Sequence, residues 1–116
     1  MTITHEFAGI AVTDFATAYD WYVRLFGRPA DIFPHDSEAV WHLTSSASVY
    51  VVGDPEHAGN ALVTLAVADL AARADRLRAS GFVLAEQSGA AAPRRLSVTD
   101  DDGNTITFFE DPAGEG

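Results

Sequence analysis

The feature that most constrains the fold of this chain is an internal duplication. Residues 9–27, GIAVTDFATAYDWYVRLFG, can be laid on residues 64–82, TLAVADLAARADRLRASGF, so that several valine, aspartate and alanine positions coincide. Farther along, VYVVGDP at 49–55 and TFFEDP at 107–112 end in the same Asp-Pro pair. Because 116 residues are too few for two independent domains, we predict one domain, 1–116, made of two copies of one module, 4–55 and 60–112.

Each copy carries the same succession of local signals. An alternating apolar run ends at an aspartate placed to cap a helix, apolar residues at helical spacing follow, and a glycine stands where the helix would stop. In the two copies these are the strands Phe7–Val12 and Leu62–Val67, the caps Asp14 and Asp69, and the glycines Gly27 and Gly81. Further strands are predicted near Pro29–Phe33, Ala39–Leu43 and Ser48–Val52, and near Val83–Glu86, Arg94–Val98 and Thr105–Phe109.

This order predicts an α+β fold of two tandem βαβββ modules with mixed β-sheet. In each module one helix covers one face of the sheet and leaves the other face free. Two free faces set side by side would form a cleft. A site is therefore expected on the strand residues that point away from the helices.

Composition and charge exclude several functions. The formal net charge of −10 argues against nucleic acid or an anionic membrane as partner, since both attract basic proteins. The chain has no cysteine and no lysine, which excludes disulfides, thiolate sites and Schiff-base chemistry. No stretch approaches the ~18 apolar residues of a membrane span, and the start MTITHEF lacks the pattern of a signal peptide, so we expect a cytoplasmic protein.

The acidic stretch TDDDGNTITFF, from Thr99 to Phe109, resembles a metal-binding loop at first sight. With Gly103 at the glycine position of a calcium loop, however, the first and last ligand positions fall on Val98 and Phe109, which cannot bind calcium. Asp-Gly and Gly-Asn both tolerate the positive φ of tight turns. The stretch is therefore predicted to be the reverse turn of a β-hairpin.

The chain resembles the vicinal oxygen chelate superfamily, which includes glyoxalase I, extradiol dioxygenases, fosfomycin-modifying enzymes and bleomycin-resistance binding proteins. The resemblance runs from about Glu6 to Pro112. It is carried by IAVTDFATAYDWYVRLFG, similar to the family pattern V-x-D-φ-x-x-A-x-x-F-Y-x-x-x-L-G, by LAVADLAARADRLRASGF, and by DDDGNTITFF, similar to D-P-D-G-N-x-x-E-φ. It implies the glyoxalase/bleomycin-resistance-like fold with a cleft.

In metal-dependent members the resemblance implies four ligands from equivalent strand positions. Carried onto this chain, those positions hold Phe7, Tyr50, Leu62 and Thr107. Phe and Leu offer no lone pair, and Thr or Tyr hydroxyls seldom anchor a divalent ion unaided. The sequence therefore predicts a member of the family without the usual metal ligands and without a cofactor.

Other residues do not form a convincing replacement site. His5 shares the face of Phe7 but lies nearer the rim, and Glu110 points away from the face of Thr107. The cluster of His35, Glu38 and His42 crosses a junction between loop and strand. A pairing of Thr107 with His42 lacks an acid to orient the imidazole. A displaced metal stays an open alternative.

Strand alternation predicts which residues face the cleft. Small residues at its back and aromatic residues at its mouth would suit a ring-bearing organic ligand, although the same set is compatible with a filled core between the modules. Trp41 is expected on the helix side and His42 on the cleft side, and Arg94 or Arg95 is available to hold an anion at the rim. The residues that we predict to bind ligand are Phe7, His42, Tyr50, Leu62, Thr107 and Phe109; Gly9, Ala11, Thr64 and Ala66 share their faces.

Two functions follow from these patterns. The first is a metal-free protein that binds a small aromatic or cationic organic molecule, such as a drug or natural product, as a homodimer like the bleomycin-resistance members. The second is a superfamily enzyme of the lyase, isomerase or dioxygenase type, with a displaced metal or with His42, Tyr50 or Arg94 in acid/base roles. Catalytic residues are left unassigned, and the identity of the ligand is not encoded in any motif.

Overall fold

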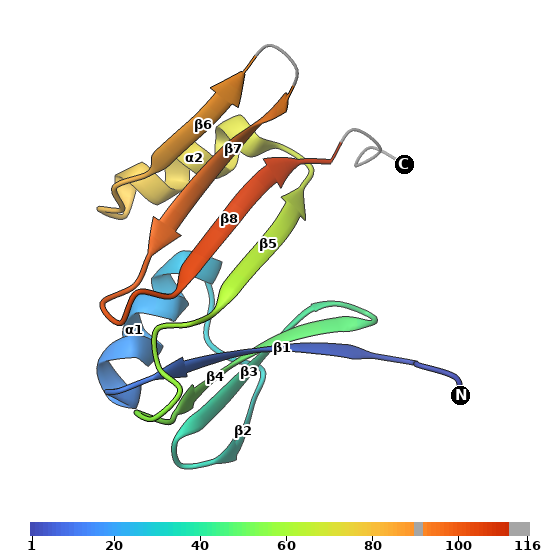
Figure 1. Ribbon diagram of the computed structural model, residues 1–116, viewed down its shortest axis with the longest axis vertical. Coiled ribbons are helices and arrows are strands. Elements are labelled where there is room, and N and C mark those ends of the chain that lie inside the picture. Colours follow the sequence, from blue (N-terminus) through green and yellow to red (C-terminus); the bar gives the residue numbers. More distant parts are fainter. Residues whose placement is uncertain (90–91, 112–116) are drawn as a thin grey trace. The chain divides into compact units, whose positions relative to one another are not determined.

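The computed structural model describes residues 1–89 and 92–111 of the chain and confirms the two βαβββ modules (Figure 1). The first module contains β1 (Glu6–Val12), α1 (Phe15–Phe26), β2 (Ile32–His35), β3 (Glu38–Thr44) and β4 (Ala47–Gly53). The second contains β5 (Leu62–Val67), α2 (Leu70–Ala79), β6 (Ala85–Gly89), β7 (Ala92–Thr99) and β8 (Thr105–Glu110). The predicted end of the second module, Pro112, lies outside the described residues.

The chain divides into two compact units that match the two modules, except that a short segment of the second module belongs to the first unit. Unit 1 comprises Met1–Ala61 together with Asp100–Asn104, and unit 2 comprises Leu62–Thr99 and the residues from Thr105 on. The acidic turn between β7 and β8 thus belongs, by its contacts, to the unit built from the first module. In the part of the chain that the structure describes, neither helix is long and apolar enough to cross a membrane.

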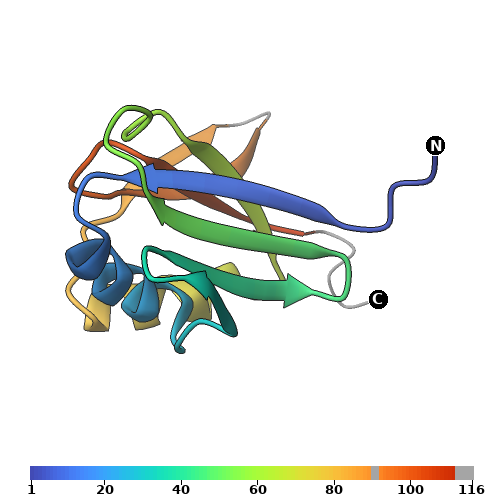
Figure 2. The same ribbon diagram turned by 90° about the horizontal axis from the view of Figure 1, so that it is seen from below.

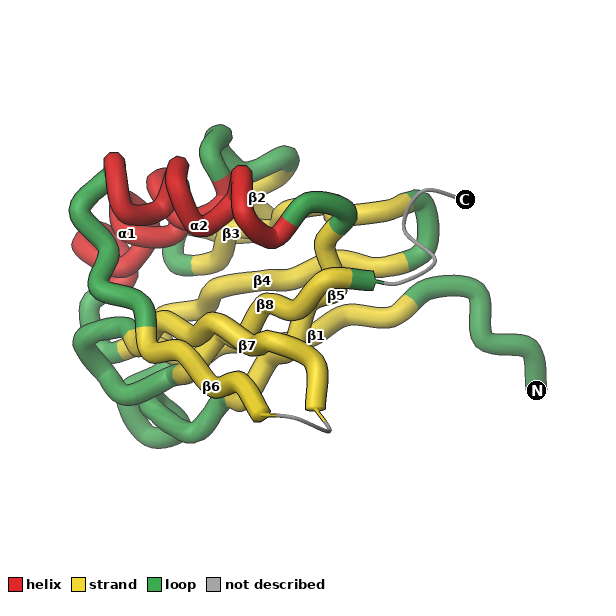
Figure 3. The backbone as a smooth tube through the Cα atoms, turned by 90° about the horizontal axis from the view of Figure 1, so that it is seen from above, coloured by secondary structure: helices red, strands yellow, loops and turns green. Residues whose placement is uncertain are grey.

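Both sheets have the same topology. The strand order is β1-β4-β3-β2 in unit 1 and β5-β8-β7-β6 in unit 2. The first strand of each pairs parallel with the last, and the remaining pairs are antiparallel. Strands β1, β4 and β3 run side by side in Figure 2, and β8, β7 and β6 do so in Figure 3. The order of the strands confirms the duplication at the level of the fold.

Asp54 and Asp111, the aspartates that close the two modules, make equivalent bonds. The Asp54 N–H donates to the Val12 carbonyl at 2.9 Å, and the Asp111 N–H donates to the Val67 carbonyl at 2.9 Å. Each bond closes the end of the parallel pair of strands in its sheet. The repeated aspartate in the sequence therefore corresponds to a repeated backbone hydrogen bond.

The helices begin and end at the predicted signals. Asp14 accepts a hydrogen bond from the Thr17 N–H at 3.1 Å, and Asp69 accepts one from the Ala72 N–H at 3.0 Å. Gly27 has a φ of 76° at the end of α1, and the bend after α2 is made at Gly81. Helix α1 packs against β4, and α2 packs against β8.

In unit 1 the core lies between α1 and one face of the sheet. Trp41 is its largest member, with ring centroids 5.7 Å from Tyr19, 6.5 Å from Tyr22 and 5.2 Å from Phe26. Its indole N–H donates to the Arg28 carbonyl at 3.0 Å. Trp41 is therefore on the helix side, as predicted. The other buried residues on this side include Ile10, Val12, Leu25, Ala39, Val49 and Val51.

The core of unit 2 is mostly aliphatic, with two phenylalanines as its aromatic members among the described residues. Helix α2 buries apolar residues from three of its turns, and the facing strands supply branched and aromatic side chains. The buried set is Val63, Leu70, Ala74, Leu77, Phe82, Leu96, Val98, Ile106 and Phe108.

Two predicted strand boundaries were wrong. The strand expected at Pro29–Phe33 is Ile32–His35, because pairing with β3 begins only at Ile32. The strand expected at Val83–Glu86 is Ala85–Gly89, since pairing with β7 begins only at Ala85.

Candidate functional site

The acidic turn is a structural element of unit 1. The Asp100 carboxylate accepts hydrogen bonds from the Tyr22 hydroxyl at 2.7 Å, from the Asn104 side-chain amide at 2.9 Å, and from the backbone N–H groups of Asp102 and Asn104 at 2.9 Å. Asp102 in turn accepts the N–H and hydroxyl of Thr13. With these donors satisfying the carboxylates, the turn interpretation is confirmed.

The uncovered face of the sheet in unit 1 is defined by alternation and register. Gly9 pairs with Tyr50, and Tyr50 pairs with Val40, so these residues share the face opposite α1. We call this the open face. Its members are His5 and Phe7, Gly9 and Ala11 of β1, Val40 and His42 of β3, and Ser48, Tyr50 and Val52 of β4.

The open face holds a hollow of about 350 Å³. Its floor is formed by small residues, and Tyr50 forms one wall. A Cβ added to Gly9 would lie 2.5 Å from Cζ and from the hydroxyl of Tyr50, so the phenol end of Tyr50 occupies the space that a side chain at Gly9 would need. The lining comprises Gly9, Ala11, Tyr50, Val52, Asp54, His57, Asn60 and Ala61.

A short loop after β4 supplies the polar edge of the hollow. His57 Nδ1 lies 2.8 Å from Asp54 Oδ2, and the His57 N–H donates to the Asp54 carbonyl at 3.1 Å. The Asn60 side chain donates to the His57 carbonyl at 3.3 Å. These three residues were not predicted from the sequence. The signal that was available was the Asp-x-x-His spacing directly after a predicted strand.

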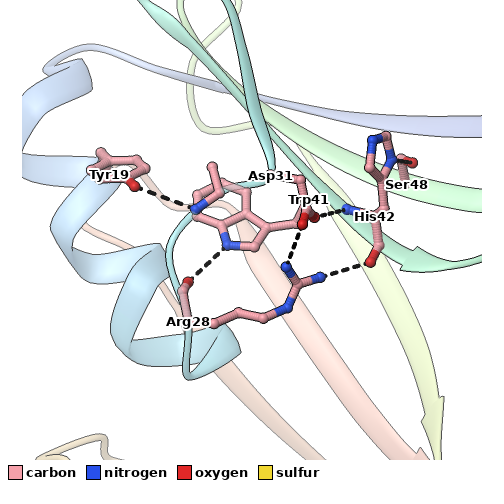
Figure 4. Close-up of polar contacts among 7 residues, drawn as sticks. Tyr19, Arg28, Asp31, Trp41, His42 and Ser48 are labelled. Carbon is pink, nitrogen blue, oxygen red and sulfur yellow. Dashed lines mark hydrogen bonds and ion pairs between the residues drawn. The ribbon is translucent and has the colours of Figure 1, made fainter.

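A second group of polar residues surrounds His42, whose side chain lies on the open face (Figure 4). The His42 N–H donates to Asp31 Oδ2 at 2.6 Å, and the His42 carbonyl accepts from Arg28 Nη2 at 2.7 Å. The His42 N–H and, after it, Arg28 hold the pKa of the Asp31 carboxyl below its ordinary value. His42 is exposed, yet its backbone is fixed from both sides.

Ser48 connects His42 to the segment before β1. Ser48 Oγ lies 2.8 Å from His42 Nδ1 and 2.8 Å from His5 Nε2. Although it belongs to the open face, Ser48 is only 2% exposed. The His5 ring packs on Phe7 with centroids 4.6 Å apart.

The sheet of unit 2 also has a face opposite its helix, and this face is rich in hydroxyls. Thr107 pairs with Thr64 on one side and with Ser97 on the other, which places three hydroxyl side chains in one row. Next to this row, the Arg95 guanidinium lies 5.8 Å from the centroid of the Phe109 ring. Arg94 points to the other face of β7 and forms an ion pair of 2.8 Å with Glu86, so of the two predicted arginines it is Arg95 that lies on this face.

The six predicted ligand-binding residues fall into two groups. Phe7, His42 and Tyr50 lie on the open face of unit 1, and of these only Tyr50 lines the hollow. Leu62, which is 85% exposed, belongs with Thr107 and Phe109 to the equivalent face of unit 2. Whether the two faces form one cleft stays a prediction.

The fold and the site define a class of protein: a repeated βαβββ chain whose sheets each keep one face free of helix, with a hollow on one such face. Comparison identifies the family within this class. The model of the glyoxalase/bleomycin resistance protein/dioxygenase superfamily matches residues 3–114, and the chain belongs to this superfamily. No curated protein sequence matches the chain.

Solved structures agree with this assignment. A glyoxalase/bleomycin resistance protein from Catenulispora acidiphila is 40% identical, with a TM-score of 0.88 over 93% of this chain and 98% of that one. TioX from Micromonospora sp. ML1 is 26% identical, with a TM-score of 0.68 over 91% and 97% of the two chains. TnmS3 from Streptomyces sp. CB03234, described as an antibiotic binding protein, is 23% identical, with a TM-score of 0.75 over 95% and 98%.

The residues do not fit the divalent metal that is implied for metal-dependent members. Phe7 and Leu62 carry no donor atom, and Tyr50 and Thr107 carry neutral hydroxyls. Among residues 1–89 and 92–111, no group of three or more histidine, aspartate or glutamate side chains is arranged to hold an ion.

Proposed function

We propose that this chain is a metal-free binding protein for a small organic molecule that carries a flat aromatic ring. The observation that carries the proposal is the hollow on the open face, where the Tyr50 phenol lies over Gly9 beside a small-residue floor. A hollow with one aromatic wall and few polar groups suits a ring held by stacking and oriented by one or two hydrogen bonds.

The charge of the chain and the polar edge of the hollow favour a cationic or hydrogen-bonding ligand. The formal net charge is −10, and Asp54 lies in the lining. A negative protein attracts cations over a distance, and a carboxylate at the edge of a pocket can receive an amine. The antibiotic-binding description of TnmS3, which shares the fold, agrees with a ligand of natural-product type. Sequestration of such a compound as a form of resistance, a homodimeric state and a cytoplasmic location are further parts of this proposal.

A thermal-shift screen with chelator-treated protein tests the proposal. Aromatic antibiotics and small oxoacids would be compared, because a ligand present at ~100 times its Kd stabilises the folded state by about 2.7 kcal/mol. Tyr50→Ala should abolish the shift. Phe33→Ala removes another half-exposed ring of unit 1, one that contacts Tyr19 on the helix side, and should preserve it.

Three outcomes would count against this function. The first is a shift that appears only when a divalent ion is returned to the protein. The second is a shift that Tyr50→Ala leaves intact. The third is the absence of any shift across the whole screen.

A second candidate function is metal-independent acid/base catalysis by a superfamily enzyme of the lyase or isomerase type. It is favoured by one observation, the contact of His5 and His42 with Ser48 on the open face. Mass spectrometry separates the two candidates: a binding protein returns its ligand unchanged, whereas an enzyme returns a product.

A further inference from the structure

The cluster of His5, Ser48 and His42 joins three separate segments of unit 1. His5 precedes β1, His42 belongs to β3, and Ser48 belongs to β4. Both imidazoles lie 2.8 Å from the same hydroxyl oxygen, and that oxygen is part of an almost fully buried residue. The bond between His5 and Ser48 joins residues far apart in the sequence, and the bond between His42 and Ser48 joins cross-strand neighbours of β3 and β4.

The chemistry of a hydroxyl group restricts how this cluster can be protonated. Ser48 has one proton to donate and lone pairs to accept with. When both imidazoles are neutral, the two facing nitrogens cannot both accept the single Ser48 proton. In the arrangement that uses this proton, one facing nitrogen donates an N–H to Ser48 while the other accepts the Ser48 proton. Two such arrangements exist, and they differ in the direction of the Ser48 hydroxyl and in the tautomer of each ring.

His42 is held in a way that suits proton transfer. Its backbone is bound by Asp31 and Arg28, which also pair with each other at 2.8 Å, and its Nδ1 faces Ser48. Its Nε2 has no hydrogen-bond partner among the described residues, and the side chain is exposed on the open face. Ser48 lies two residues before Tyr50 on β4, about 7 Å along the strand. The hollow is lined from Gly9 and Tyr50 toward Asp54 and His57, so a ligand reaches His42 by extending past Tyr50 along the open face.

We propose that His42, Ser48 and His5 form a proton relay, in which His42 Nε2 exchanges a proton with a bound ligand and His5 Nδ1 exchanges one with water. This inference rests on the proposed binding of a ligand to the open face. It goes beyond that function by assigning an acid/base group and the path of its proton.

The transfer balances at each atom. The ligand gives a proton to His42 Nε2 and keeps the bonding electron pair as an enolate or phenolate. The proton on His42 Nδ1 passes to Ser48 Oγ, the original Ser48 proton passes to His5 Nε2, and His5 Nδ1 releases its proton to water. Both rings end neutral in their other tautomers, and the reverse sequence returns a proton to the ligand. The ligand class is therefore a ring compound with an acidic proton, either a phenol or a carbonyl compound with an adjacent C–H.

The relay itself can be tested in the free protein by NMR of histidine ring nitrogens. At pH 8 we expect one of His42 Nδ1 and His5 Nε2 to carry a proton and the other to lack one. Ser48→Ala should remove this complementarity, and Ser48→Thr, which keeps a hydroxyl, should restore it. Protons on both facing nitrogens, protons on neither, or signals unchanged in Ser48→Ala would overturn the relay without bearing on ligand binding.

The role of the relay can be tested with 2-tetralone, a ring compound with an acidic C–H beside a ketone. Its hydrogen–deuterium exchange in heavy water would be followed by proton NMR, and its binding would be followed separately by thermal shift. We expect exchange faster than in buffer, a loss of about 100-fold in His42→Gln and about tenfold in Ser48→Ala, recovery in Ser48→Thr, and no loss in the control Phe33→Ala.

The outcomes separate the two proposals. If 2-tetralone binds but wild-type exchange equals that in buffer, or if His42→Gln exchanges like wild type, the assignment of His42 is overturned while the binding function stands. If neither 2-tetralone nor any other ring compound binds, the proposed function fails, and the NMR result alone decides whether the relay exists.

Discussion

At the scale of single residues, the Tyr50 ring occupies the space on the open face that a side chain at Gly9 would fill. Gly9 and Tyr50 are direct neighbours in the parallel pairing of β1 and β4, and the Tyr50 phenol fills the volume above Gly9. The shape of the hollow therefore depends on the absence of one methyl group.

Gly9→Ala tests this dependence. The new Cβ would lie 2.5 Å from the end of the Tyr50 ring, so we expect the ring to rotate and the backbone to stay in place. Ligand affinity should fall about tenfold, or about 1.4 kcal/mol, because the aromatic wall moves. The measurement is a titration by calorimetry, with the Tyr50 ring signals followed by NMR. Tyr50→Phe, which keeps the ring, is the matched control, and equal affinity in Gly9→Ala and wild type would contradict the role of this contact.

Tyr22 provides a residue-scale prediction about pH. Burial, and then the hydrogen bond to Asp100, raises the pKa of the Tyr22 phenol above its ordinary value near 10.0. Since the native state holds this proton more tightly than the unfolded state does, its stabilising contribution is complete below about pH 10 and is lost as the pH rises further. The free energy of unfolding of the wild type should therefore decrease above pH 10.

Tyr22→Phe should lower stability by about 2 kcal/mol at pH 7, because Asp100 loses one of its donors, and should weaken the alkaline dependence. Urea denaturation at pH 7 and pH 10.5 measures both effects. Tyr19→Phe is the control, since the Tyr19 hydroxyl only accepts the Ala30 N–H at 3.3 Å. A parallel loss of stability with pH in Tyr22→Phe and wild type would show that another group titrates.

At the scale of secondary-structure elements, caps and turns that depend on neighbouring residues could be predicted from the sequence. Contacts between distant segments could not. The caps at Asp14 and Asp69 act on residues three positions away, so their pattern is visible in a short window. The partners of Asp100 include Tyr22, which is distant in the sequence. The turn could thus be predicted as a turn, but its attachment to unit 1 could not.

Asn104 connects this turn to the rest of unit 1 by hydrogen bonds. It is fully buried, its side-chain amide donates to the Ala11 carbonyl at 2.8 Å and to Asp100 at 2.9 Å, and its oxygen accepts the Ala61 N–H at 2.9 Å. Asn104→Asp replaces the donor with a charge beside Asp100, so we expect a loss of about 3 kcal/mol or more in urea denaturation. Asp101→Asn, an exposed change in the same turn, should stay within about 0.5 kcal/mol of wild type. Similar effects in the two variants would contradict the structural role of the turn.

At the scale of the whole molecule, the repeated strands of the two modules made part of the site predictable from the sequence. Because strand alternation has a period of two, it correctly placed Phe7, Gly9, Ala11 and Tyr50 on one face. It could not place Asp54 and His57, whose loop after β4 adopts a conformation that periodicity does not specify. The position of that loop depends on Asn104 through the bond to Ala61, which is a contact between distant segments.

The net charge of the molecule gives a final prediction about association. A formal charge of −10 produces a field that reaches ~30 Å at ~10 mM salt and only ~3 Å at ~1 M salt. The association rate of a cationic ring ligand should therefore fall at least about tenfold across this range, whereas that of a neutral analogue of the same shape should change little. Stopped-flow fluorescence with such a matched pair measures both rates.

Dissociation should respond differently, because it depends on contacts within the hollow and not on the distant field. Asp54→Asn should accelerate dissociation of the cationic ligand, since Asp54 is the carboxylate in the lining, while the remote change Asp101→Asn should leave dissociation unchanged. Equal salt dependence for the cationic and neutral ligands would show that long-range attraction does not guide binding. In that case the selectivity of the protein would have to come from the shape of the hollow around Tyr50 alone.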